Sequence, residues 1–313
     1  DIIAWSAGFQ EPDENKLGQT GEVFVNFLRS HNCQFIALFD GLEESPFSDL
    51  SSDKATQKAL QALLQEVPQW LEQFPKRPLG ILIFIRQDMV RHAIQQNTGQ
   101  FINLYNPYVL KWNPEEALRL ALWIGIKARL LKEQEKNLVN LDFQELSDKL
   151  IPLWGKRMGK DNSKEADSAK WVIAALSDFK QQLQARDIVG FIYQAASKTS
   201  KSKQSQWNDR ILSPQAIREA VKTSSKHKID EIKQENFDLR DIFDLLGKSL
   251  KKSIPFTQEE TDLTTQQLKI LEDNGIIILD NDRYYMPLIF VEGLGFKYTK
   301  PGRWKVLSLL RTN

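Results

Sequence analysis

The segment Phe35-Ile36-Ala37-Leu38-Phe39-Asp40-Gly41-Leu42-Glu43-Glu44 decides the fold class of this chain, because an unbroken apolar run ends in acidic residues. A second run, Leu79-Gly80-Ile81-Leu82-Ile83-Phe84-Ile85, ends in Arg86-Gln87-Asp88. Continuous runs of this kind are typical of strands that are covered on both faces in a parallel sheet. Between them, apolar residues recur every three or four positions over residues 60–74, which predicts an amphipathic helix that is kinked or restarted at Pro68. Strand, helix and strand in this order predict a crossover unit of an α/β sheet.

The polar ends of the two runs are the best candidates for chemistry. The carboxyl ends of parallel strands face the ligand crevice at one edge of a sheet. There Asp40 can orient the water shell of a nucleotide-bound Mg²⁺, and Glu43 or Glu44 can polarise an attacking water. Arg86 can neutralise phosphate charge. The alternative is that Asp40 only turns the chain with Gly41, that the glutamates are solvated, and that Arg86 forms a salt bridge with Asp40 or Glu43.

The middle of the chain predicts helices. Asn113 is a predicted cap and Pro114 a first helical residue, and the apolar sequence that follows to residue 131 predicts a buried helix. From residue 140 to 197 every segment has a helical pattern and none has a strand pattern. The polar, basic stretch 197–205 predicts a mobile linker.

The last hundred residues predict helices followed by a hairpin. Ser213-Pro214 predicts another helix start, and Asn274-Gly275 a left-handed helix end. The expected elements are helical patterns at 216–221, 230–234, 240–250 and 264–273, then a β-hairpin of 276–279 and 283–290 around a turn at 280–282. This layout predicts a winged-helix domain.

Composition narrows the function classes. The 313 residues include 42 basic and 41 acidic side chains, a formal net charge of +1, so the overall charge indicates neither a nucleic-acid nor an anionic-membrane partner. The single cysteine, Cys33, excludes an intramolecular disulfide framework and suits a reducing cytoplasm. No apolar run approaches the ~18 residues that a membrane span needs. The chain begins at Asp1 without an initiator Met or a signal peptide, so we expect it to be cut from a longer protein.

Several of these segments resemble P-loop NTPases of the STAND and KAP-like type, which are related to AAA+ proteins. Residues 39–44 resemble the Walker B motif and residues 83–88 the sensor-1 strand with its terminal Arg86. Residues 110–118 look like the apolar-Trp segment and helix that lead into the lid. Residues 184–191 are similar to the start of a lid helix, and Arg186 then corresponds to the sensor-2 arginine. The alternative for Arg186 is a capping pair with Asp187.

The resemblance implies a fold, a site and ligands. The implied organisation is an α/β core portion with a parallel sheet (1–130), an all-α lid (131–198), a linker (199–212) and a helical plus winged-helix domain (213–313), mainly α overall. The implied ligands are ATP and Mg²⁺. Asp40, Arg86 and Arg186 would bind them, Asp40 would hold Mg²⁺ through water, and Glu43 or Glu44 would be catalytic. The implied function is a signalling or defence switch that forms homo-oligomers when ATP is bound.

One motif of that family is missing from the sequence. A Walker A loop needs two glycines five residues apart, followed by Lys and Ser or Thr. Gly247-Lys248-Ser249 has this ending, but Ile242 stands where the first glycine belongs. We therefore expect the loop either to lie upstream in a longer protein or to be lost, and the 313 residues alone to bind ATP poorly.

The charge of the predicted winged helix favours a protein partner over DNA. On the helix 264–273, Lys269 is outnumbered by Glu272 and Asp273, and in the turn Arg283 is outnumbered by Asp280 and Asp282. DNA affinity depends on several phosphate contacts. Basic residues do gather near the end, at Lys297, Lys300, Arg303, Lys305 and Arg311. The alternative function is a non-catalytic interaction or DNA-binding module on a degenerate NTPase scaffold. The three histidines, His31, His92 and His227, lack the spacing of a zinc site.

Overall fold

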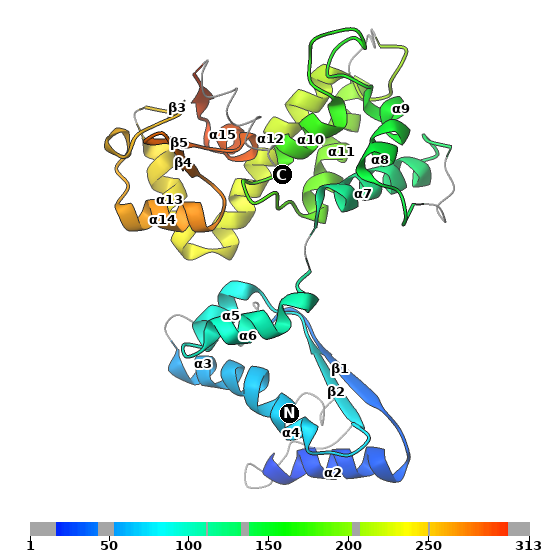
Figure 1. Ribbon diagram of the computed structural model, residues 1–313, viewed down its shortest axis with the longest axis vertical. Helices are drawn as coiled ribbons and strands as arrows, with labels where there is room; N and C mark the ends of the chain where they lie inside the picture. Colours follow the sequence, from blue (N-terminus) through cyan, green and yellow to red (C-terminus); the bar gives the residue numbers. More distant parts are fainter. Residues whose placement is uncertain are drawn as a thin grey trace. The chain divides into compact units, whose positions relative to one another are not determined.

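The structure is a computed structural model that describes residues 17–42, 53–110, 112–132, 138–201, 207–249 and 251–299, with only the backbone of 17–20, 237 and 238. The chain forms two compact units, which divide between Val109 and Leu110 (Figure 1). The described residues are mainly helical with three two-stranded sheets, of which two are parallel. The mainly α architecture predicted from the sequence is thus confirmed.

The first unit places helices around one parallel pair of strands. Its elements are α2 (Leu17–Ser30), β1 (Phe35–Phe39), α3 (Lys54–Gln61), a π-helical turn η2 (Ala62–Glu66), α4 (Val67–Glu72), β2 (Leu79–Ile83), α5 (Gln87–Ala93), α6 (Thr98–Tyr105) and a 3₁₀ turn η3 (Asn106–Tyr108). β1 and β2 pair in parallel, from Phe35 opposite Leu79 to Phe39 opposite Ile83. The prediction that both apolar runs lie in one sheet is therefore confirmed.

The crossover between the strands is one helical path with a local change of pitch. Asp53 caps α3 by accepting hydrogen bonds from the backbone N–H groups of Ala55 and Thr56. The helix widens to a π-turn just before α4, which has Pro68 in its first turn. A proline lacks the N–H that an interior helical position donates, and the π-turn just before Pro68 is the local change found there. The predicted restart of the helix is not observed, because the helical backbone continues from α3 into α4.

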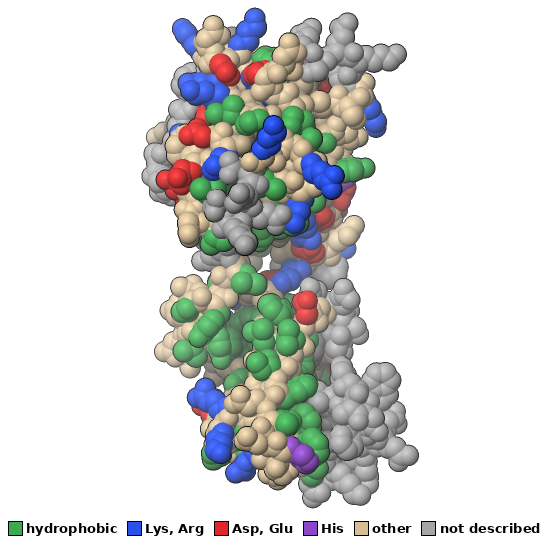
Figure 2. All heavy atoms as spheres, turned by 90° about the vertical axis from the view of Figure 1, so that its right-hand side faces the viewer, with side chains coloured by type: hydrophobic (Ala, Val, Ile, Leu, Met, Phe, Trp, Pro, Cys, Tyr) green, Lys and Arg blue, Asp and Glu red, His purple; other side chains and the backbone are tan. Residues whose placement is uncertain are grey.

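Only one face of this sheet is covered by described residues. Figure 1 shows α3 to α6 to one side of β1 and β2, and Phe39 and Ile83 pack there on a core that includes Leu60 and Val90. On the other face Ile36 and Leu38 are 63% and 64% exposed, and Leu82 is 46% exposed. Figure 2 shows hydrophobic side chains gathered over the first unit on the side that faces the viewer. The predicted cover on both faces is not present in the described part of the chain.

The second unit is helical and ends in short strands. Its elements are α7 (Pro114–Lys127), α8 (Phe143–Lys149), α9 (Ile151–Trp154), α10 (Ser168–Leu176), α11 (Ala185–Lys201), α12 (Pro214–Glu235), α13 (Phe237–Lys248), β3 (Ser253–Ile254), a 3₁₀ turn η5 (Gln258–Glu260), α14 (Thr265–Asp273), β4 (Ile278–Asp280), β5 (Arg283–Tyr285), α15 (Leu288–Leu294) and β6 (Lys297–Tyr298).

α7 belongs to this second unit. Its predicted cap forms, since the Asn113 side chain accepts a hydrogen bond from Glu116 N at 2.7 Å. Leu118 and Leu122 are fully buried in the same core as residues of α8, α10 and α11. The boundary therefore falls at residue 109 rather than at the expected 130, because the apolar face of α7 packs on the helices that follow it.

The stretch expected to be a linker is partly built into this unit. Residues 199–201 complete α11. Ile211 N and Leu212 N donate hydrogen bonds to Pro152 O and Leu153 O, at 3.0 and 2.7 Å. The Arg210 side chain is fully buried beside them. The expected linker 199–212 is thus anchored at both of its described ends, and residues 202–206 lie outside the described residues.

α12 joins two hydrophobic cores. Ile217 and Val221 lie in the core shared with α7 to α11, and Ile229 lies in the core shared with α13, α14 and α15. The two patterns expected at 216–221 and 230–234 are thus one helix of 22 residues. Its predicted cap is present, with Ser213 Oγ accepting from Ala216 N at 3.2 Å.

The predicted hairpin is present but shorter than expected. β4 and β5 pair in antiparallel fashion around Asn281 and Asp282, whose φ angles of 47° and 57° make the tight turn. Gly275, with φ 69°, ends α14 as predicted. The second strand stops at Tyr285, and residues expected to continue it form α15, whose Ile289, Phe290 and Val291 are buried. The winged-helix identity of these elements stays a prediction.

No helix in the described residues is long and apolar enough to cross a membrane.

Candidate functional site

Asp40 and Arg86 follow the two strands at the same edge of the sheet. Phe84 N donates a hydrogen bond to Phe39 O at 2.8 Å, so the parallel register continues beyond the last paired residues and sets Asp40 beside Phe84. Arg86 lies two residues further on. The prediction that both charged residues come to one edge is confirmed for the backbone, and a shared polar site of their side chains stays a prediction.

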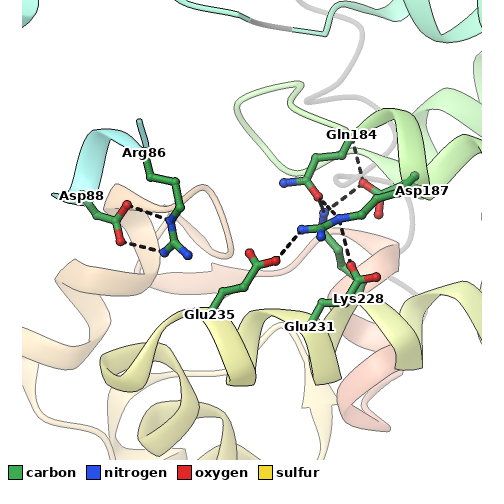
Figure 3. Close-up of polar contacts among 8 residues, drawn as sticks. Arg86, Asp88, Gln184, Asp187, Lys228, Glu231 and Glu235 are labelled. Carbon is green, nitrogen blue, oxygen red and sulfur yellow. Dashed lines mark hydrogen bonds and ion pairs between the residues drawn. The ribbon is translucent and has the colours of Figure 1, made fainter. Parts of the chain in front are cut away.

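The side chains at this edge have local partners. The Asp40 carboxylate accepts a hydrogen bond from Gly41 N at 2.9 Å, and Gly41 has φ 71°, so these residues do turn the chain. Arg86 forms a fork with Asp88 in the first turn of α5, with Nε–Oδ1 at 3.1 Å and Nη2–Oδ2 at 2.7 Å (Figure 3). A bidentate pair fixes the plane of the guanidinium.

The predicted catalytic residues Glu43 and Glu44 lie outside the described residues. Among the residues that the structure does describe, no three His, Cys, Asp or Glu side chains group as metal ligands. Mg²⁺ bound with a nucleotide keeps several waters and needs only one or two carboxylates. The Asp40 carboxylate is an oxygen ligand of the kind Mg²⁺ requires and therefore fits the implied ion.

A second polar cluster lies in the second unit, where the start of α11 meets the end of α12. Asp187 closes the first turn of α11 by accepting from Gln184 N at 2.8 Å. It also forms an ion pair with Lys228 of α12 at 2.9 Å, in which the side chains are only 5% and 12% exposed. Lys228 also donates to Gln184 Oε1 at 2.8 Å (Figure 3).

Arg186 is held by two acids of α12. Its Nε lies 3.2 Å from a Glu231 carboxylate oxygen, and its Nη2 lies 2.8 Å from one of Glu235. Burial acts to lower the pKa of Arg186, but the hydrogen bond and the charge of Glu235, with Glu231, raise it overall. The alternative named in the sequence analysis, a capping pair of Arg186 with Asp187, is not observed among the described residues. Asp187 pairs with Lys228 instead. Arg186 belongs to the second unit, whereas Asp40 and Arg86 belong to the first.

The acids that hold Arg186 were missed in the sequence. Lys228, Glu231 and Glu235 are spaced three and four residues apart, which places them on one face of a helix. That spacing was the available signal. Their meeting with residues 184–187 depends on the antiparallel packing of α11 on α12, which the sequence pattern does not specify.

Comparison with known proteins finds no counterpart for this chain: no protein-family profile matches it, no curated protein is significantly similar, and no solved structure matches.

Proposed function

We propose that this chain is an ATP-binding and ATP-hydrolysing regulatory switch module of the STAND or KAP-like type, completed by a phosphate-binding loop upstream. The observation that carries the proposal is the parallel pairing of β1 with β2, which brings Asp40 and Arg86 to one sheet edge. Ligands of open α/β sheets bind at the carboxyl ends of the strands.

The open face of the first unit supports an incomplete core. Two strands alone are marginally stable, and parallel sheets are normally covered on both faces. Ile36, Leu38 and Leu82 together expose an apolar surface opposite the helices. We infer that further strands and helices of the NTPase core, including the one that carries the loop, cover this surface.

Each candidate residue has a role in this proposal. Asp40 orients the waters of Mg²⁺, which supplies charge neutralisation to the phosphates, and Glu43 or Glu44 positions the attacking water. Arg86, oriented by Asp88, neutralises charge on the phosphate. For Arg186 the sensor role comes from the resemblance alone, and its partners within the second unit are Glu231 and Glu235. Half-exposed ion pairs contribute only about 0–1 kcal/mol each, so this arginine is weakly held.

ATP hydrolysis by two versions of the protein tests the proposal. The 313 residues alone should turn over little or no ATP, and a protein that includes the loop should be active. In that longer protein, Glu43→Gln or Glu44→Gln should slow hydrolysis by about 100-fold while ATP binding is retained. Robust turnover by the 313 residues would mean that the phosphates bind elsewhere.

The second candidate is a non-catalytic module that binds protein or DNA through the hairpin region. The charge of α14 favours a protein partner over DNA, because Lys269, the cation of this helix, is paired with Asp273 at 3.0 Å. Leu279 of β4 is 48% exposed and offers apolar contact to a protein. Titration of duplex DNA at two salt concentrations separates these cases: binding weakened by Lys269→Ala would support DNA readout, and binding unaffected by it would not.

A further inference from the structure

A small groove lies between α11 and α12, away from the residues discussed above. It has a volume of about 250 Å³ and is lined by Lys198, Glu219, Lys222, Thr223, Lys226 and His227. Five of these six come from α12 at spacings of three and four residues, so they share one face of that helix.

The cations of this groove differ from the other cations of α12. Arg218 pairs with Glu165, Lys228 with Asp187, and Lys233 with Asp244. Within the described residues, Lys222, Lys226 and His227 make no ion pair and no side-chain hydrogen bond. α12 therefore neutralises its positive charges everywhere except in the concave region.

The groove holds a net excess of positive charge. Its one carboxylate, Glu219, is 3.9 Å from the Lys198 ammonium, the outer limit of an ion pair, and also accepts from Gln215 Nε2 at 3.0 Å. Lys222 and Lys226 are four residues apart on α12, and like charges at this spacing repel each other and destabilise a helix. A bound anion would remove this repulsion.

We propose that this groove binds a compact, multiply charged phosphate compound of the pyrophosphate class. Lysines bind phosphate as flexible point charges. The volume is below the roughly 300–1,000 Å³ of pockets for drug-sized ligands, which suits a small anion. The lining has no Phe, Tyr or Trp side chain, on whose large rings the bases of single-stranded nucleic acids usually stack. This site is independent of the ATP site proposed above.

Calorimetric titration of the 313-residue protein with pyrophosphate, with inorganic phosphate and ATP as comparison ligands, tests the proposal. The double variant Lys222→Ala and Lys226→Ala should weaken pyrophosphate binding at least about tenfold. This corresponds to a loss of ~1.4 kcal/mol in binding free energy. Glu219→Gln should tighten pyrophosphate binding about threefold, because it removes a negative charge that repels the anion. Equal affinities for ATP and pyrophosphate would show that the site binds phosphate groups whatever molecule carries them. A preference for pyrophosphate would show that the natural ligand is a free anion. Both results support the phosphate site.

The matched control is Lys156→Ala with Lys160→Ala, which removes two exposed lysines of the same unit. These substitutions should change the affinity less than about twofold. An equal loss in the control and the groove variant would mean attraction by overall charge and would overturn the proposal. Absence of pyrophosphate binding at millimolar concentration, or weaker binding by Glu219→Gln, would also overturn it.

Discussion

Among the residues that the structure describes, Asp178 is the carboxyl whose charge most directly couples the stability of this fold to pH. It lies between α10 and α11, and its Oδ1 accepts from Gln182 N at 2.7 Å and Lys180 N at 2.8 Å. Burial raises its pKa to about 6, although both hydrogen bonds and the charges of Lys180 and Lys228 act to lower it. A carboxyl with a raised pKa stabilises the fold when protonated. This contribution to stability is fully present when the pH is below about 4, the pKa of the carboxyl in the unfolded chain. It is lost as the pH rises through about 6, the pKa in the folded protein.

We expect Asp178→Asn to stabilise the protein above pH 7. The amide keeps the Oδ1 acceptor and removes a partly buried charge, so the gain should be about 1–2 kcal/mol, or a rise in Tm of a few degrees. Thermal unfolding from pH 4 to 8 should show the gain shrinking as the pH falls, while exposed Asp262→Asn has little effect at any pH. A loss of stability that is the same at every pH would contradict this role of Asp178.

Arg210 is a buried cation that holds a loop in place. Its Nη1 donates to Arg157 O at 2.6 Å and Trp154 O at 3.4 Å, and its guanidinium fills the space where a side chain of Gly155 would lie. Arg210→Ala removes the donor to the buried Trp154 carbonyl and to the partly buried Arg157 carbonyl, and should cost about 3 kcal/mol in the free energy of unfolding.

Denaturant unfolding measures this cost. The exposed Lys269, which pairs with Asp273, is the control, and Lys269→Ala should have a much smaller effect. Equal effects of the two substitutions would show that the burial of Arg210 does not contribute as argued. The burial itself was not predictable, because Arg210 stands in a polar stretch whose composition indicates a linker.

At the scale of elements, α15 packs closely on α12 at Gly293. A Cβ added to Gly293 would lie 2.5 Å from Ile229 Cγ1 and 2.6 Å from Ser225 O, so only glycine fits. Gly293→Ala should destabilise the protein by about 1–3 kcal/mol through overpacking. Gly190→Ala in α11, where nothing lies within 4 Å of the added carbon, should instead stabilise by up to about 1 kcal/mol. Chemical denaturation of both variants checks this, and the same sign for both would contradict the packing argument.

The elements themselves were largely predictable where local chemistry decides them. Asn113 and Ser213 cap helices as expected, and Gly275 ends α14, because each effect depends on nearby backbone groups alone. The sequence failed where tertiary packing decides. The apolar run after β5 looked like more strand, but burial against α12 makes it α15.

At the scale of the whole molecule, the common edge of Asp40 and Arg86 could be predicted because parallel strands meet at their carboxyl ends. The immediate partners of these residues could not, since Arg86 reaches Asp88 within its own turn. The unit boundary at residue 109 was also missed, because the packing of α7 on later helices is not visible in its own periodicity. Parallel pairing therefore supports the nucleotide-site proposal, and the assignment of roles depends on experiment.

The most direct test of the central claim is MgATP hydrolysis by a protein that contains these residues and the upstream loop, compared between wild type and Asp40→Asn. If Asp40 orients the waters of Mg²⁺, turnover should fall by about 100-fold or more. The control Glu72→Gln, at an exposed acid of α4 in the same unit, should leave turnover unchanged. Wild-type turnover by Asp40→Asn would contradict the proposal that the edge of β1 and β2 is a nucleotide site.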